Sequence, residues 1–108
     1  MVRTLATATE NNMAVEAQSL YFQLGMVADD DGFINNTMSI ARMCGFGKAE
    51  INTLIDNSFL IHFESGVDVL RHWKLCNYIQ SDRYKPTEFI AEKNSLQLKN
   101  NIYILDSS

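Results

Sequence analysis

Basic and aromatic side chains are interleaved between residues 71 and 85, a combination that suits contact with polynucleotides. This segment contains Arg71, His72, Trp73, Lys74, Tyr78, Arg83, Tyr84 and Lys85. Cations contact phosphates, and aromatic rings stack on bases with about 1 to 3 kcal/mol for each stacked base of a single strand. The alternative is that Trp73 and Tyr78 belong to the core and that the cations form an ordinary solvated rim. We expect five of these residues to contact nucleic acid: Arg71, Lys74, Arg83, Tyr84 and Lys85.

A second set of candidate contacts lies on a predicted helix that opens at Gly47. If this is the second helix of a helix-turn-helix, its first residues meet base edges in the major groove. The residues so placed are Lys48, Asn52 and Thr53, because Asn pairs with adenine and Lys reaches guanine. Glu50 and Asp56 on the same helix would repel phosphates. The alternative is that these polar residues only solvate the outer side of a core helix.

Other chemistry is not supported by residue spacing. His62 and His72 have no Ser or Cys partner in a recognisable motif, and the residues around Gly45 and Gly47 lack the spacing of a phosphate-binding loop. The run Asp29 to Gly32 does not fit an EF-hand and is typical of a turn that ends a helix. Two cysteines, Cys44 and Cys76, show no metal-ligand spacing, and we expect both to be reduced and mostly buried. We therefore expect no enzyme activity, no metal and no cofactor.

The length and charge of the chain set further limits. Its 108 residues suit one core, and nine Lys and Arg against thirteen Asp and Glu give a net charge of −4. This balance weakens any claim of tight, autonomous DNA binding, which usually needs a clear basic excess. No apolar run is long enough to span a bilayer, and residues 1–12 contain no signal-peptide core. We expect a cytoplasmic protein without a membrane anchor.

The hydrophobic periodicity predicts the elements that would position these side chains. Apolar spacing indicates a helix over 14–26, and capping residues before Met38 begin a second, which Gly45 ends. Leu60–Glu64 and Val67–Trp73 are strand-like and flank Ser65-Gly66, a two-residue hairpin signal. Between and beyond these elements the sequence predicts a short extended piece at 33–34 and a helix from Gly47 to about 58. The C-terminal part is predicted to contain a short helix or turn over 74–82, a basic loop over 83–87, a helix over 87–93 capped by Thr87, and a small hairpin over 95–104.

This order of elements is that of a small α+β winged helix-turn-helix domain. It has a three-helix core and a wing of two or three strands, with an extra C-terminal helix and a further strand or hairpin. We divide the chain into a poorly ordered segment at 1–12, the winged-helix domain at 13–95 and a C-terminal extension at 96–108. The predicted wing tip contains Glu64 and Asp68, carboxylates that disfavour insertion into a minor groove.

Several short segments of the sequence also resemble one protein family. They are residues 19–26 (SLYFQLGM), 28–36 (ADDDGFINN), 63–67 (FESGV), 72–74 (HWK), 77–79 (NYI) and 82–87 (DRYKPT). Together they resemble the N-terminal domain of phage replisome organisers and DnaD-like replication-initiation proteins of Gram-positive bacteria and their phages. The resemblance runs from about Ala17 to Lys93 and implies a winged-helix module. In longer relatives this module is attached to a domain that helps load helicase or bind single strands.

Two departures from the family pattern affect what the resemblance implies. Residues 1–12 do not look like the usual start of these domains, and no second domain follows. We therefore expect a fragment, a truncated paralogue or a stand-alone adaptor.

Two functions are consistent with the sequence. The first is a DNA-binding module of a phage-type replication-initiation protein, with duplex or single-stranded DNA as its partner. The alternative is a protein-interaction module that self-associates or holds a replication protein and has little DNA affinity of its own. The acidic balance and the carboxylates of the wing favour this alternative, because they lower DNA affinity without affecting protein docking.

Overall fold

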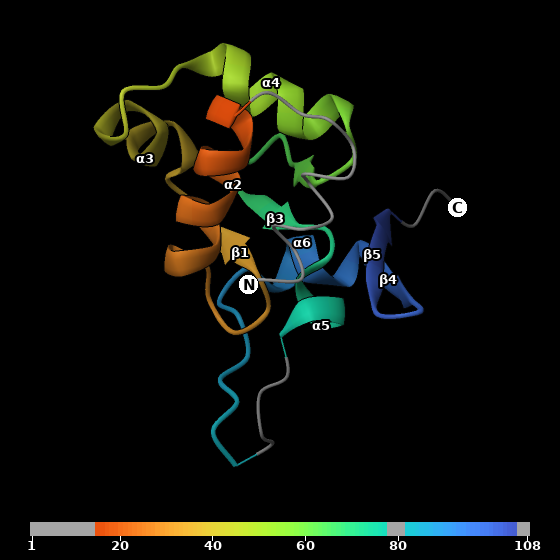
Figure 1. The fold of residues 1–108 in the computed structure, drawn as a ribbon. Coiled ribbons are helices and arrows are strands. Elements are labelled where there is room, and N and C mark those ends of the chain that lie inside the picture. Colours follow the sequence, from red (N-terminus) through yellow and green to blue (C-terminus); the bar gives the residue numbers. More distant parts are fainter. Residues whose placement is uncertain (1–14, 78–81, 106–108) are drawn as a thin grey trace.

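A computed structural model describes residues 15–77 and 82–105 (Figure 1). Three helices occupy one side of it: α2 (Val15–Val27), α3 (Thr37–Met43) and α4 (Lys48–Asp56). The helical spacing predicted for α2 is confirmed, because its inward side buries Ala17, Leu20, Tyr21 and Leu24 completely. α2 packs against both α3 and α4.

A small antiparallel sheet lies against these helices. Its strands are β1 (Phe33–Ile34), β2 (Leu60–His62) and β3 (Asp68–Leu70), in the order β1-β3-β2. Phe33 pairs with Val69, and Ile61 pairs with Val69 from the other side. All three residues of β3 are buried, as expected for a central strand.

The turn between α2 and β1 depends on its aspartates and its glycine. The Asp29 carboxylate accepts hydrogen bonds from the backbone N–H groups of Asp31 (2.9 Å) and Phe33 (3.0 Å). Gly32 has a φ of +87°, which favours glycine, and a Cβ there would lie 2.6 Å from the Cβ of Trp73. The prediction that this run ends a helix in a tight turn agrees with the structure.

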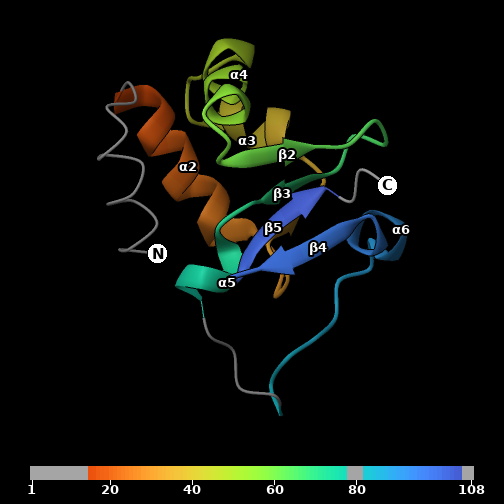
Figure 2. The same cartoon turned by 90° about the vertical axis from the view of Figure 1, so that its right-hand side faces the viewer.

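The C-terminal part adds two short helices and a second sheet. These elements are α5 (Trp73–Cys76), α6 (Ile90–Asn94), β4 (Leu96–Lys99) and β5 (Ile102–Leu105). β4 and β5 form a hairpin whose turn residues, Asn100 and Asn101, both have positive φ. Figure 2 shows this hairpin against the rest of the molecule, and Tyr103 of β5 is part of the same core.

Two predicted element boundaries are wrong. β3 ends at Leu70, so His72 and Trp73 are not strand residues; Trp73 begins α5, and its indole N–H donates to the Asp30 carbonyl at 3.0 Å. Thr87 does not cap a helix, because α6 begins only at Ile90. Thr87 is buried instead, and its hydroxyl donates to the Asp29 carboxylate at 2.5 Å.

The loop of the β2–β3 hairpin also differs from the prediction. It contains three residues, because the Phe63 N–H donates to the Val67 carbonyl at 2.9 Å and Gly66, with a φ of +90°, completes the turn. Such loops commonly place glycine at their last position.

The α+β class is confirmed, whereas the segment 1–12 predicted to be poorly ordered lies outside the described residues.

Candidate nucleic-acid interface

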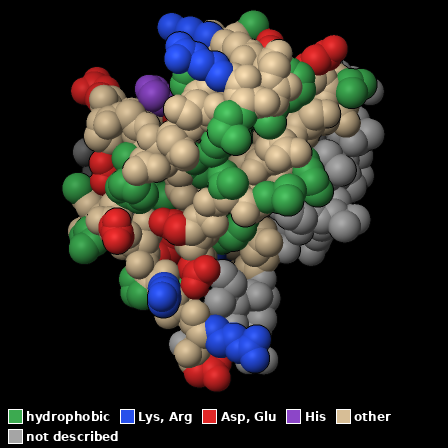
Figure 3. Space-filling model, turned by 90° about the vertical axis from the view of Figure 1, so that its left-hand side faces the viewer, with side chains coloured by type: hydrophobic (Ala, Val, Ile, Leu, Met, Phe, Trp, Pro, Cys, Tyr) green, Lys and Arg blue, Asp and Glu red, His purple; other side chains and the backbone are tan. Residues whose placement is uncertain are grey.

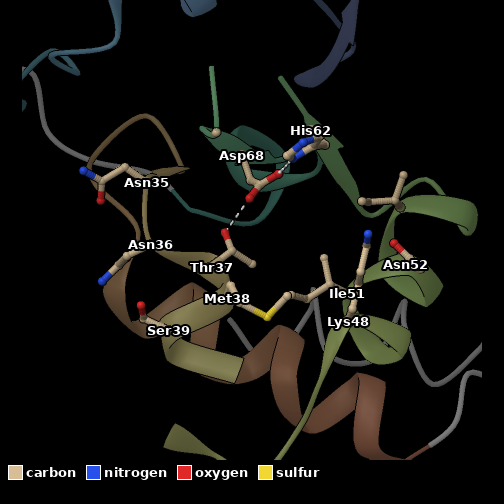
Figure 4. A pocket seen from close by; sticks show the side chains of 12 residues that line it. Asn35, Asn36, Thr37, Met38, Ser39, Lys48, Ile51, Asn52, His62 and Asp68 are labelled. Atoms are coloured by element: carbon tan, nitrogen blue, oxygen red, sulfur yellow. Dashed lines mark hydrogen bonds and ion pairs between the residues drawn. The ribbon is translucent and has the colours of Figure 1, made fainter. Parts of the chain in front are cut away.

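A groove of about 580 Å³ opens between the start of α3, the length of α4 and the β2–β3 hairpin (Figure 4). Its rim is polar and its floor includes apolar side chains from the two helices. The lining residues are Asn35, Asn36, Thr37, Met38, Ser39, Lys48, Ile51, Asn52, Ile55, His62, Gly66 and Asp68. Two of the sequence-predicted contacts, Lys48 and Asn52, therefore lie in one concave surface.

The rim of this groove is rich in unused hydrogen-bonding groups. Asn35, Asn36, Ser39, Lys48 and Asn52 are all exposed. Within residues 15–77 and 82–105, none of these five side chains makes a hydrogen bond or ion pair. Donors and acceptors that the fold does not use are free to contact a ligand.

The hairpin side of the groove is organised by Asp68. This residue is 3% exposed, and its carboxylate accepts a hydrogen bond from the Thr37 hydroxyl at 2.6 Å. Its other oxygen lies 2.7 Å from Nδ1 of His62, whose side chain is 53% exposed. Asp68 thus joins α3 to both strands of the hairpin, as the dashed lines in Figure 4 show.

The β2–β3 loop, predicted to be a wing tip with two exposed carboxylates, has one. Glu64 is exposed, whereas Asp68 is buried. The tip itself is held from the other side, because the Ser65 hydroxyl donates to the Glu92 carboxylate of α6 at 2.6 Å.

Helix α4 presents Lys48 and Asn52 one turn apart. Glu50, expected to repel phosphates, instead accepts a hydrogen bond from the Gly47 N–H at 2.9 Å and so caps the helix. The hydroxyl of Thr53 donates to the Ala49 carbonyl at 2.9 Å, and Thr53 does not line the groove. Of the three predicted contacts on this helix, the structure brings two together.

The segment from Arg71 to Lys85 has a different environment from the one expected. The Lys74 ammonium lies 2.7 Å from the Asp31 carboxylate, and the Tyr84 hydroxyl donates to the same carboxylate at 2.6 Å. Arg71 Nε donates to the Tyr103 carbonyl at 3.0 Å. Three of the five predicted contacts in this segment are thus engaged inside the protein. Arg83 and Lys85 are exposed, and Tyr78 lies outside the described residues.

Asp31 is the centre of this internal network. It is fully buried and also accepts from the Thr87 N–H at 2.8 Å and from the Lys93 ammonium at 3.3 Å. Burial by itself raises the pKa of Asp31, but the hydrogen bonds from Lys74, Tyr84 and Thr87 and the Lys74 charge lower that pKa to about 2. The pKa of Lys93 is raised, because burial, which lowers it, is outweighed by Tyr84 and Asp31.

The exposed cations of the second predicted surface, Arg83 and Lys85, lie at the opposite end of the molecule from α4, whereas Arg71 lies in a hollow beside β2. In Figures 1 and 2, α4 lies at the top and the loop that contains Arg83 and Lys85 at the bottom. On the face drawn in Figure 3, the Lys and Arg side chains gather at the upper and lower ends, and acidic side chains lie beside the lower group. One DNA segment therefore cannot easily reach both surfaces.

Sequence reasoning missed part of the groove. Asn35 and Asn36 were expected only to cap a helix, and Thr37, Ser39, His62 and Asp68 were not expected to share a site. No local pattern signals this, since the Thr37–Asp68 hydrogen bond joins residues that are far apart in the sequence.

Among residues 15–77 and 82–105, no group of three or more His, Cys, Asp or Glu side chains is placed to hold a metal ion. Cys44 is a free, half-buried thiol. No helix in the described part of the chain has the length and apolar character needed to cross a bilayer.

Fold and groove together define a small α+β domain with an open groove between two helices and a β-hairpin, lined mostly by polar side chains that include Lys48, His62 and Asp68. No protein-family model matches the chain, and no curated protein or solved structure is significantly similar to it.

Proposed function

We propose that this chain is a winged-helix module that binds duplex DNA, as expected for a phage-type replication-initiation protein. The order helix, strand, helix, helix, hairpin and the sheet order β1-β3-β2 support the winged-helix assignment. The observation that carries the proposal is that Lys48 and Asn52 lie side by side in an open groove with no internal partner in the described residues. The resemblance of residues 17–93 to replisome organisers is the basis for the role in replication.

The chemistry of the groove suits a base edge flanked by phosphates. Asn52 offers an amide that can pair with adenine through both its donor and its acceptor, and Lys48 offers a flexible cation for guanine or phosphate. Asn36 and Ser39, on the α3 side, are short polar groups of the kind that contact the DNA backbone.

Duplex DNA fits the groove better than a single strand. Proteins that bind single strands stack bases on aromatic side chains. Among the described residues, no Phe, Tyr or Trp lines this groove, and the aromatic residues Trp73 and Tyr84 are buried or bonded elsewhere. The groove contains one Lys, so we expect a weak dependence on salt, with a slope of about −1 to −2.

A fluorescence anisotropy titration at low salt tests the proposal. A labelled duplex of mixed sequence is titrated with the wild type, with the double variant Lys48→Gln, Asn52→Ala, and with the control Arg83→Gln, Lys85→Gln. The control removes two charges from the opposite end of the molecule. We expect the groove variant to lose at least about tenfold in affinity and the control to retain most of it. The proposal fails if folded wild type binds no duplex, or if only the control loses affinity.

The alternative function, self-association, has one observation in its favour. The outer side of α2 exposes Val15 (70%), Phe22 (38%) and Met26 (63%). Exposed apolar side chains that gather on one helix face are typical of protein contacts. Light scattering over a range of concentrations tests this function: we expect a concentration-dependent dimer that Met26→Lys weakens, and a strict monomer would exclude it.

A further inference from the structure

We propose that His62 is a phosphate-contacting residue of the groove and that its protonation strengthens DNA binding. This inference rests on the proposed function, and it adds both a contact residue and a form of regulation that the sequence does not suggest. It is carried by the geometry of the hydrogen-bonded series Thr37, Asp68 and His62.

The His62 ring is held in a fixed orientation at the edge of the groove. Its Nδ1 lies 2.7 Å from one oxygen of Asp68, and the other oxygen accepts from Thr37 at 2.6 Å. The Asp68 side chain is 4% exposed, whereas that of His62 is 53% exposed. The carboxylate is therefore anchored in the protein, and the imidazole reaches from it into solvent.

The hydrogen bond between Nδ1 of His62 and Asp68 determines which ring nitrogen gains or loses a proton. A carboxylate only accepts, so Nδ1 carries a proton in both states of the ring. In the neutral imidazole, Nε2 is then an acceptor and repels the oxygens of a phosphate. When the ring gains a proton, Nε2 becomes a donor and the ring a cation, so a charge-assisted hydrogen bond to phosphate becomes available.

Charged side chains of the described residues lie on several sides of the groove and hairpin around this ring. Asp68 approaches from β3, Lys48 lies on α4 across the groove, and Glu64 follows β2 in the hairpin loop. On its other side, His62 shares a hollow with Arg71 and β5. When its ring is protonated, His62 adds a second cation to the groove, beside that of Lys48.

The chain contains one other histidine, which serves as a control. His72 is half-buried, its ring lies 5.2 Å from that of Phe59, and it does not line the groove. Burial, with a smaller contribution from Arg71, lowers the pKa of His72, so this ring stays neutral to lower pH.

The test measures the dissociation constant for the duplex at pH 5.5, 6.5 and 7.5 at constant ionic strength. Wild type is expected to bind roughly fivefold more tightly at pH 5.5 than at pH 7.5, the effect of one charge-assisted phosphate contact. His62→Gln should lose this dependence on pH, since Gln can still donate to Asp68 but cannot become a cation. His72→Gln should keep it.

A second measurement needs no substitution. If protonated His62 contacts phosphate, saturation with duplex moves the midpoint of its ring titration, followed by NMR, about 0.7 unit to higher pH, which corresponds to fivefold. An unchanged midpoint, or a pH dependence that persists in His62→Gln, would overturn the inference while leaving DNA binding itself intact. Absence of binding at every pH, 5.5 included, would instead refute the proposed function and the inference with it.

Discussion

The ammonium of Lys74 and the buried carboxylate of Asp31 lie 2.7 Å apart and join α5 to the turn between α2 and β1. The same carboxylate holds Tyr84, Thr87 and Lys93. Since these residues belong to the C-terminal part, the acidic turn fastens that part to the helices that form the groove. Lys74 and Tyr84, which the sequence predicted to contact DNA, thus stabilise the fold instead.

Replacing Asp31 with Asn is expected to destabilise the protein by about 2–4 kcal/mol, because two lysines lose their counter-charge in a buried site. Urea unfolding followed by circular dichroism measures this. The control is Asp30→Asn, whose side chain accepts from the Lys85 N–H at 2.9 Å in an exposed position. We expect the control to change the free energy of unfolding by less than about 1 kcal/mol. Equal effects of the two substitutions would contradict this account of Asp31.

The low pKa of Asp31 predicts how stability depends on pH. Its folded value of about 2 is below the ordinary 3.8, so the folded state favours the ionised form. This contribution, roughly 2–3 kcal/mol, is fully present above about pH 4 and is lost as pH falls through 3.8 towards 2. Urea unfolding at pH 5, 4, 3 and 2 measures it. Asp31→Asn should show a smaller fall over this range, and an equally steep fall in both proteins would refute the assignment.

The elements of the fold were largely predictable, because each depends on local patterns. The periodicity of Leu20 and Leu24, the polar residues before α3 and the glycines at 45 and 66 predict helices, strands and turns close to those observed, although the Asn36 side chain does not cap α3. Trp73 was misplaced because the preceding strand-like run suggests that the strand continues. Trp73 instead lies against Gly32 just beyond the end of β3, a contact between residues far apart in the sequence.

The candidate site was less predictable, because it depends on contacts between residues that are far apart in the sequence. Lys48 and Asn52 were found because they lie one helical turn apart, whereas His62 and Thr37 join them only through Asp68. The composition of their segment suggested that Lys74 and Tyr84 face solvent. This prediction failed because no local pattern shows that Asp31 is buried beside them.

Glycine is required at position 32 for two separate reasons, and this predicts a large effect of Gly32→Ala. The φ of +87° strains any residue with a Cβ, and that Cβ would lie 2.6 Å from both Cβ and Cγ of Trp73. We expect a loss of about 3 kcal/mol or more in thermal or urea unfolding. Gly66→Ala is the matched control, because its φ is +90° but nothing lies within 4 Å of the added Cβ. Its cost should be only the backbone strain, about 1–2 kcal/mol.

Lys48→Gln and Lys74→Gln each remove one positive charge, but the structure predicts opposite consequences. Lys48 is exposed in the groove, so its loss should weaken duplex binding roughly three- to tenfold and change the free energy of unfolding by less than about 0.5 kcal/mol. Lys74 is paired with buried Asp31, so its loss should cost about 2–3 kcal/mol of stability. Its effect on binding should be less than twofold, measured where both variants are folded.

The comparison separates the two surfaces, because the change in net charge is the same in both variants. If non-specific attraction between the whole protein and DNA governed binding, both substitutions would weaken it equally. A larger loss of affinity for Lys74→Gln than for Lys48→Gln would move the contact surface to the C-terminal part. The reverse order, together with the stability difference, assigns Lys48 to the ligand and Lys74 to the fold.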